Sequence, residues 1–578
     1  MRRTSASNAM ATSTFVRRYV GYATAFVLTF ACMLAVLSTE YGVSVIFFTM
    51  LLPVTCAALA VTGYAMAASQ TTRRLPDCGY GAATEKAFVV VPVIVGSAQD
   101  VDASVLALRE NASSTPTHLS LVLAVDFIDA ATEKTAQDEV LIARLKAGLE
   151  DVRREHGARC GALVRKRTYN ASAHVWMGWE RKRGKLIEVF KWLRGHKVPS
   201  VSWLAECDID ECVFAIALDR DARLTRGAAE RLISVASYGP HRALVTGNQI
   251  LAGFTIIVPR IEKREPERKT SFYRLNEYVA QPSESGVRPD LHQDGRGQAA
   301  FYGKGLIDID AFLALCDTGV PENSVLSHDH LEGMLGRCAL VSDAVITEEN
   351  PIGWAAWRRR QSRWCKGDFL LIRWIFLGRA YESSAARIDR LSRWLLLENL
   401  IRHLSVVGVA ASTAVLMAKA QSSFVLPLLF LATPSPLGVV VAALVPGRTT
   451  PRGSLLRQIR SEATQWCAAT LVASAYLFAN AADTLVAVAA AVYGQFRKGR
   501  NLEWDAPSWR VPLWCRILVM AVVPCVVLLS LVGASAHPPV TLIAVATWTI
   551  APIISLCVPR RVVQRTQRDP SKAGGVAG

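Results

Sequence analysis

Hydrophobic and polar residues divide this chain into apolar ends and a charged, mixed centre. Two apolar runs near the start, Tyr19–Ser38 and Val43–Ala68, are each long enough to cross a bilayer. From about residue 70 to residue 378, short apolar runs alternate with charged, amphipathic stretches. Apolar runs return later, at Leu404–Met417, Phe424–Val445, Ile517–Val532 and Val540–Val558. The pattern predicts a folded central domain between membrane helices.

The central segment has the pattern of a layered α/β domain. Buried strands are expected at Ala87–Val95, Leu119–Val125 and Cys212–Leu218, with an amphipathic helix at Gln137–Glu155. Alternation of this kind indicates a largely parallel sheet. Ligands of such sheets bind beyond the carboxyl ends of the strands. Asp126 and Asp219 follow two of the apolar runs, so both are expected at that edge.

The remainder of the chain is expected at or in a membrane. The basic, tryptophan-bearing stretch from Arg387 to Arg402 is typical of an amphipathic interfacial helix. Residues Trp466–Phe496 are ambiguous, because their flanks are basic and Asp483 in the middle favours a helix that does not span. We therefore expect a transmembrane hairpin, a central domain, an interfacial helix, further transmembrane or interfacial helices and a disordered tail, at residues 1–69, 70–378, 379–402, 403–563 and 564–578.

Charge gives the expected orientation. The net charge is +17, and hydrophobic residues make up 51% of the 578 residues. Arginines precede the first apolar run and follow the second at Arg73 and Arg74, whereas the short link carries Glu40 and no base. The positive-inside rule then places the central domain in the cytoplasm of a multi-pass protein, in a plasma or inner membrane. Nucleic-acid binding is less favoured, because the basic residues accompany apolar runs and no binding module is recognisable.

Two sequence motifs give this orientation a test. Asn111-Ala-Ser and Asn170-Ala-Ser match glycosylation acceptors. A cytoplasmic domain predicts that both stay unmodified in a secretory host.

Thirteen cysteines are scattered through the chain without a CxxC pair. Neither a zinc site nor a disulfide framework is indicated. Reduced, packed thiols are expected.

The Asp-x-Asp pairs Asp208/Asp210, Asp219/Asp221 and Asp308/Asp310 are candidates for holding a divalent cation. Such a pair suits Mg²⁺ or Mn²⁺ bound together with the diphosphate of a sugar nucleotide. Asp219 and Asp221 are favoured, because they follow the buried run that ends at Leu218. Asp208/Asp210 is expected to be solvated, and Asp308/Asp310 to lie at a helix start.

Two residues are candidates for binding the donor nucleotide. Asp126 could accept hydrogen bonds from a nucleobase or ribose, or could cap a loop. Lys185 lies beside a predicted helix start, where a phosphate could bind, although it could equally belong to a solvated basic face.

The acidic stretch Ser327-His-Asp-His-Leu-Glu332 contains the candidate general base. A placed carboxylate can remove the proton from an acceptor hydroxyl, and Asp329 is our first choice for that role. Glu332, one helical turn away, is either the alternative base, in contact with the acceptor, or a structural hydrogen-bond partner. His328 and His330 are expected to orient their neighbours rather than to bind metal.

The stretch Arg360-Gln-Ser-Arg-Trp364 supplies cations and an aromatic ring. The forked donors of Arg360 and Arg363 suit a diphosphate. The indole of Trp364 suits the apolar face of a sugar ring. The alternative for this cluster is an aromatic belt at the membrane interface.

In this order the motifs resemble those of the processive, inverting GT-A glycosyltransferases that make cellulose, chitin and hyaluronan. The D, DxD, TED and QxxRW motifs of that family correspond to Asp126, Asp219/Asp221, Ser327–Asp329 and Arg360–Trp364. The chain is more similar still to the glycosyltransferase module of cyclic β-1,2-glucan synthases, at Trp176–Leu186, Gly303–Phe312, Val320–Asp329, Arg363–Asp368, Leu391–Trp394 and Leu502–Trp504.

The resemblance implies a Rossmann-like GT-A domain inserted between transmembrane helices. It implies an inverting transferase that takes a nucleotide-sugar donor, such as UDP-glucose, and extends a growing glycan acceptor at the lipid bilayer. The phosphorylase-like module of cyclic synthases has no counterpart here, so a linear β-1,2-glucan-like product is expected. The alternatives are transfer of one sugar to a lipid phosphate and a catalytically silent scaffold or export subunit.

Three residues depart from the family pattern. Arg360 stands where most synthases have Gln, and His328 replaces the Glu of TED. Arg220 lies inside the favoured Asp-x-Asp pair, where it either weakens cation binding or points away.

Overall fold

The fold is seen in a computed structural model of the whole chain. It describes residues 85–266, 270, 272–273, 293, 298–317, 319–380, 386–418 and 470–496, with isolated positions at 51, 53–56, 58, 428, 460, 464, 467, 544, 546–548 and 550–551. The predicted hairpin and tail, and the predicted apolar runs after residue 418, lie mainly or wholly outside these residues.

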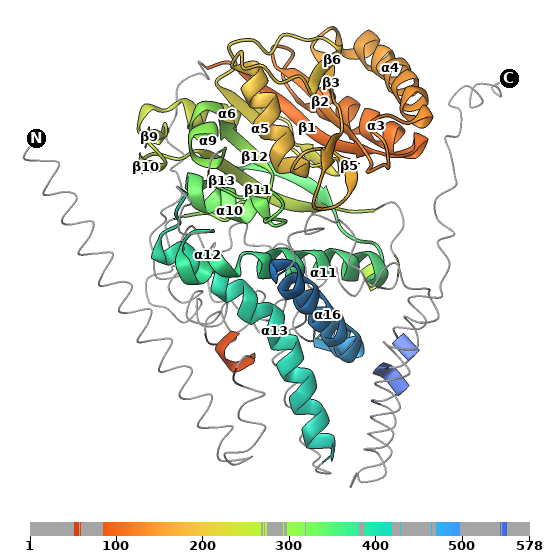
Figure 1. The fold of residues 1–578 in the computed structure, drawn as a ribbon, viewed down its shortest axis with the longest axis vertical. Helices are drawn as coiled ribbons and strands as arrows, with labels where there is room; N and C mark the ends of the chain where they lie inside the picture. The colour runs from red at the N-terminus through yellow and green to blue at the C-terminus, as the bar shows by residue number, and fades with distance from the viewer. Residues whose placement is uncertain are drawn as a thin grey trace, which may run out of the picture.

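A nine-stranded sheet forms the core of the domain in the upper part of Figure 1. Across it the strands are β6 (Val201–Ala205), β3 (Cys160–Arg165), β2 (Ser120–Phe127), β1 (Ala87–Val95), β7 (Phe214–Ala217), β12 (Gly305–Asp308), β11 (Ile256–Arg264), β13 (Cys338–Glu349) and β8 (Ala222–Leu224). The expected α/β domain is confirmed, but the sheet is mixed rather than largely parallel: the strands β3-β2-β1-β7 are parallel to one another, and β11 is parallel to β13. Elsewhere β12 runs antiparallel to both neighbours, and edge strands β6 and β8 are antiparallel as well.

Alternate residues of the central strands face two separate cores. In β1, Val89 and Val91 pack with the helices α3 (Ala98–Ser114), α4 (Ala136–His156) and α6 (Ala228–Ser237). Phe88 and Val90 of the same strand pack with α5 (Arg181–Leu193) and α9 (Ile309–Cys316) on the other face. Both faces are therefore covered, which explains why these strands are continuous apolar runs.

Shorter elements complete the domain. They are β4 (Thr168–Asn170) paired with β5 (Val175–Met177), η1 (Gly239–His241), β9 (Leu244–Thr246) paired with β10 (Gln249–Ala252), and α10 (His328–Gly336). The eight cysteines at described positions are all free, as expected. Burial raises the pKa of Cys207 and of Cys212 to about 12.

Below the sheet domain in Figure 1 lie the helices α11 (Trp354–Leu370), α12 (Ile372–Leu377), α13 (Arg390–Ala418) and α16 (Leu477–Phe496). Most of the expected interfacial stretch and the run Leu404–Met417 form one continuous helix, α13. Among described residues, two helices are long and apolar enough to cross a bilayer, at Arg390–Met417 and Leu477–Gln495. Buried helices of soluble proteins share these properties, so the bilayer stays a prediction.

Candidate active site

Asp219 lies just past the end of β7, at the edge where the parallel strands β1 and β2 also end. Lys182 Nζ, from the first turn of α5, donates to Asp219 Oδ1 at 2.5 Å. Lys304 Nζ donates to Asp219 Oδ2 at 3.0 Å and to Glu348 Oε2 at 2.7 Å. Burial alone would raise the pKa of Asp219, but the two ammonium charges outweigh it and hold that pKa well below its usual range. Asp219 is therefore a fixed anion.

Asp221 has a different electrostatic setting from Asp219. Restricted hydration, and then the negative charge of Asp219, raise the pKa of the Asp221 carboxyl. Two like-charged carboxylates close together favour a bound cation, because a cation relieves their repulsion.

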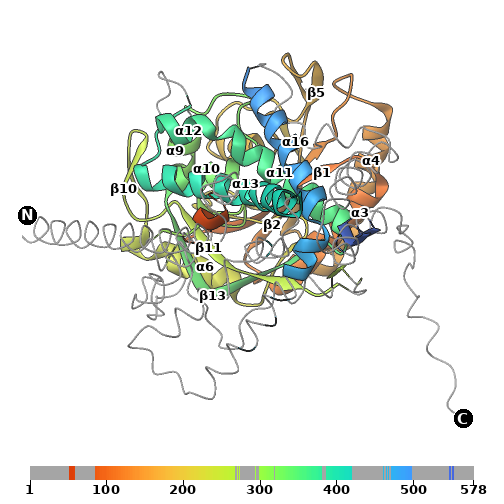
Figure 2. The ribbon, with the colours of Figure 1, turned by 90° about the horizontal axis from the view of Figure 1, so that it is seen from below.

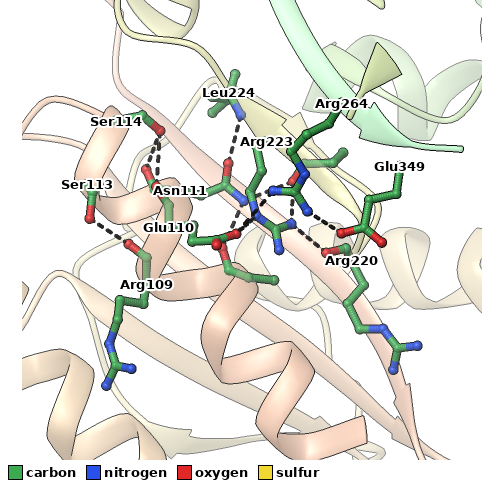
Figure 3. A network of polar contacts seen from close by, with 12 residues as sticks. Arg109, Glu110, Asn111, Ser113, Ser114, Arg220, Arg223, Leu224, Arg264 and Glu349 are labelled. Carbon is green, nitrogen blue, oxygen red and sulfur yellow. Dashed lines mark hydrogen bonds and ion pairs between the residues drawn. The ribbon is translucent and has the colours of Figure 1, made fainter. Parts of the chain in front are cut away.

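The backbone of the Asp219–Leu224 segment is held from behind by α3 and by Arg223 (Figure 3). Arg223 pairs with Glu110 and donates to the carbonyl oxygens of Arg220 and Ala222 at 2.6 Å and 2.9 Å. The Arg220 guanidinium pairs with Asp100 Oδ1 at 2.9 Å. Of the two sequence alternatives for Arg220, the structure shows the one in which it points away from the carboxylate pair.

Asn111 belongs to the same support. Its side chain is fully buried, donates to the Ala222 carbonyl at 3.1 Å and accepts from the Leu224 amide at 2.9 Å. The Asn170 amide nitrogen donates to Asn323 Oδ1 at 2.5 Å. The orientation test at these two acceptor motifs stays a prediction.

Gly303 brings Asp219 and Asp329 together. Lys182 Nζ donates to the Gly303 carbonyl at 2.8 Å while it holds Asp219. A Cβ atom added at Gly303 would lie 2.9 Å from Lys182 Nζ and 3.6 Å from Asp329 Oδ2. Asp329 is half-buried in the first turn of α10, where a helix N-terminus favours a carboxylate.

Arg360 and Arg363 approach this acidic group from α11. Burial lowers the pKa of Arg363, and neighbouring Arg360 lowers it further, against the opposing charges of Asp219, Asp329 and Asp221. The Arg360 guanidinium lies 4.8 Å from the ring centroid of Trp364, which is 44% exposed. Both arginines thus lie within electrostatic range of the carboxylates, and an indole is open to solvent beside them.

Asp126 and Lys185 form a separate, buried cluster. Asp126 Oδ1 and Oδ2 accept from Arg165 at 2.8 Å and 2.7 Å, and Lys185 Nζ lies 3.3 Å from Oδ2. Lys185 also donates to the Val93 carbonyl at 2.6 Å, and burial lowers its pKa to about 8. Neither residue lies on a solvated face.

The Asp126 cluster supports the start of α5. Arg165 donates to the carbonyl oxygens of Trp179 and Arg181 at 2.8 Å and 3.0 Å. Glu180 and Arg181 have positive φ angles of 49° and 54°, so this turn is fixed by its contacts rather than by local preference. Through it, Asp126 and Arg165 place Lys182.

Glu332 is the partner of His328. The Glu332 carboxylate is 2% exposed, and its Oε2 lies 3.1 Å from His328 Nδ1. Burial would lower the pKa of His328, but Glu332 outweighs it and raises that pKa. The structure thus pairs Glu332 with His328 behind Asp329.

The carboxylates fit a divalent cation by donor type. Asp219 and Asp221 offer the oxygen ligands that Mg²⁺ prefers, with the remaining ligands left to phosphate and water. Within the described part of the chain, no group of three or more His, Cys, Asp or Glu side chains could hold a metal ion. Both Asp219 oxygens already accept from lysines, so the pair fits a cation only with a diphosphate to draw those lysines away.

Sequence reasoning missed Lys182, Lys304, Gly303 and Arg165. Lys182 and Lys185 are three residues apart on one helix face, and the sequence alone did not tell which of them meets the carboxylates. The start of the helix could have singled out Lys182, because α5 begins at Arg181 and Lys182 therefore lies in its first turn. Nothing in the sequence indicates Lys304.

Comparison with known proteins supports the resemblance. No family model matches the chain. Over 344 residues, 57% of this chain, the sequence is 31% identical to the cyclic beta-(1,2)-glucan synthase NdvB of Rhizobium meliloti strain 1021. The match spans only 12% of that protein's length. It confirms the resemblance to this group that the motifs indicate.

Two solved structures are also similar. The mannosyltransferase PcManGT from Pyrobaculum calidifontis, in complex with GDP-Man and Mn²⁺, matches 73% of this chain and 97% of its own, with 14% identity and a TM-score of 0.35. Residues 1–349 of TarS from S. aureus, in complex with UDP-GlcNAc, match 72% of this chain and 92% of their own, with 11% identity and a TM-score of 0.29. These TM-scores are too low for either structure to support a conclusion about this chain.

Proposed function

On the premise of this relationship to cyclic β-1,2-glucan synthases, we propose that the chain is a membrane-embedded, inverting glycosyltransferase. It takes a nucleotide-diphosphate sugar, UDP-glucose by resemblance, and builds a linear, β-1,2-linked glucan. The observation that carries the proposal is the group of carboxylates and cations around Gly303. There Lys182 holds Asp219, and Asp329 lies beside the same glycine.

Asp329 is the general base. A carboxylate in the first turn of α10 accepts the proton of the acceptor hydroxyl while that oxygen attacks the anomeric carbon. Attack from the face opposite the diphosphate turns an α-linked donor into a β-glycoside. Glu332 is not a second base, because it is buried against His328.

The cations of the site stabilise the departing diphosphate. Lys182, Lys304, Arg360 and Arg363 supply fixed positive charge where negative charge develops. Asp219 and Asp221 would hold Mg²⁺ or Mn²⁺, which when bound neutralises diphosphate charge. Trp364 offers its exposed indole to a sugar ring of the acceptor glycan.

The buried pair of Asp126 with Arg165 supports the donor site through helix α5. We assign it the role of holding the start of α5, and with it Lys182, next to Asp219. The bilayer holds α13 and α16, with the sheet domain on the cytoplasmic side. As part of the same proposal we assign the protein to a plasma or inner membrane.

Membranes containing the protein, incubated with labelled sugar nucleotides and Mg²⁺ or Mn²⁺, test the proposal. We expect release of nucleoside diphosphate and a product that linkage-specific β-1,2-glucan hydrolases digest. Asp329→Asn should reduce turnover at least a thousandfold, about 4 kcal/mol of transition-state stabilisation. Asp310→Asn is the matched control, because Asp310 is exposed and pairs with Arg194 outside the site. Wild-type protein that releases no nucleoside diphosphate from any donor would contradict the assignment.

The two alternatives are separable by the same assay. Transfer of one sugar to a lipid phosphate gives a lipid-extractable product of fixed size rather than a polymer. The silent-scaffold reading relied on Arg220 and His328, and it loses support because Arg220 pairs with Asp100 and His328 with Glu332.

A further inference from the structure

Helix α11 has two faces with different partners. Arg358, Ser362 and Cys365 follow one another at spacings of four and three, so they share one side of the helix, and all three are buried. Arg360 and Arg363 lie on the other side, with the carboxylates. Figures 1 and 2 both show α11 beside α13 and α16, and it packs against both helices.

One contact joins the first half of α11 to α16. The Arg358 guanidinium and the Asp483 carboxylate form a two-bond ion pair, and the residues are 1% and 6% exposed. Around it, Trp354 Nε1 donates to Asn480 Oδ1 at 3.3 Å, and the Trp354 ring stacks on Tyr476 with centroids 4.6 Å apart. Asp483, which the sequence analysis took as a sign against a span, is thus a buried partner of the helix that carries Arg360, Arg363 and Trp364.

A second contact holds the other end of α11. Asp368 is 4% exposed; its Oδ1 lies 3.2 Å from His330 Nδ1 of α10, and its Oδ2 lies 3.0 Å from His403 Nε2 of α13. Burial would lower the pKa of His330, but the bond to Asp368 outweighs it and raises that pKa to about 9. His330 follows Asp329 directly, so this contact links the candidate base to α11 and α13.

Both contacts are costly to break on one side only. A buried charge that loses its partner cannot recover hydration, whereas an apolar pair of similar volume often replaces the whole ion pair without loss. Such contacts therefore fix how two helices meet more strictly than apolar packing does.

We propose that Asp483 and Asp368 are positioning residues, which hold α11 at its two ends against α16 and α13 and thereby fix Arg360, Arg363 and Trp364 over the carboxylates of the sheet domain. The inference rests on the proposed function for its catalytic consequence. It makes the apolar helices part of the active-site framework, beyond any role as anchors.

The test compares Asp483→Asn and Asp368→Asn in the full chain, reconstituted in lipid nanodiscs. Hydrogen exchange of α11 amides without substrate is the first readout, and kcat is the second. We expect α11 to exchange at least tenfold faster in each variant, β1 and β2 to exchange as in wild type, and kcat to fall at least tenfold. The double variant Arg358→Met with Asp483→Leu should regain slow exchange and most of kcat.

Asp138→Asn is the matched control. It breaks a buried ion pair with Arg167, in which Asp138 Oδ2 accepts at 2.6 Å, and Asp138 lies in α4, at the top of the sheet domain in Figure 1, whereas α11 lies below that domain. It should lower the unfolding midpoint and leave α11 exchange and kcat unchanged.

The inference would be overturned by α11 exchange that is unchanged in both Asp variants, or by faster α11 exchange with unchanged kcat. Exchange that rises equally in β1, β2 and α11 would also overturn it, because that is general destabilisation. A wild type inactive on every donor refutes the proposed function instead, and the exchange readout still decides whether these carboxylates hold α11.

Discussion

Gly178→Ala is a sharp test of the buried cluster beneath the donor site. A Cβ atom at Gly178 would collide with Asp126 Oδ2 and lie 2.7 Å from Arg165 Nη2. Neither group can move away easily, because Arg165 is also bonded to Glu188 and to the carbonyl oxygens of Trp179 and Arg181. The added methyl group must therefore separate the ion pair or shift the turn before α5.

The cost follows from these contacts. Breaking a buried ion pair costs roughly 3–5 kcal/mol, and overpacking a tight site costs roughly 1–3 kcal/mol. Taking about 3 kcal/mol for partial relief of both, the unfolding midpoint should fall by roughly 6–12 °C for a domain of this size. Turnover should fall too, because Lys182 moves with the start of α5.

Thermal unfolding of the purified protein, followed by intrinsic fluorescence, measures the effect. Gly239→Ala is the matched control, because a Cβ atom there has nothing within 4 Å and the backbone needs no positive φ. The control midpoint should stay within about 2 °C of wild type, since surface substitutions of this kind change stability little. A Gly178→Ala protein as stable as the control would refute the close packing of Asp126, Arg165 and Gly178.

Three further predictions follow from the same contacts. Lys182→Met should weaken nucleoside diphosphate binding about tenfold in calorimetry, because the Lys182 ammonium lies at Asp219. Lys185→Met should change the same affinity by less than about threefold, because Lys185 is bonded to the Val93 carbonyl; the opposite ranking would restore Lys185 as the phosphate ligand. Protonated His330 should contribute up to about 3 kcal/mol of stability below about pH 6.5, and wild type should lose this contribution as the pH rises through about 9. His330→Gln should lack the contribution, so equal curves of unfolding midpoint against pH for the two proteins would contradict the prediction. Asn111→Ala should lower the unfolding midpoint by several degrees, because the wild-type side chain donates to the Ala222 carbonyl and accepts from the Leu224 amide inside the fold; a midpoint equal to that of wild type would contradict these contacts.

Much of the fold followed from local sequence alone. The expected strand at Ala87–Val95 matches β1, and the helix expected at Gln137–Glu155 lies within α4 (Ala136–His156). These elements are readable because a strand buried on both faces must be apolar throughout, and a half-buried helix must be amphipathic. The same reasoning placed Asp126 and Asp219 at the strand ends that share one edge.

The mixed pairing of the sheet was beyond the sequence. Short apolar runs carry no sign of direction, so β12, inserted antiparallel between β7 and β11, reads like any other buried strand.

The individual contacts of the site also needed the tertiary structure. Lys182 and Lys185 have the same charge and face, and only the packing of α5 on β1 buries one and leaves the other at Asp219. The pairing of Arg358 with Asp483 joins residues 125 positions apart. Periodicity reports which side of an element is buried. Periodicity does not show which group packs against the buried side. That group decides whether a charge is solvated, paired or held at a reacting group.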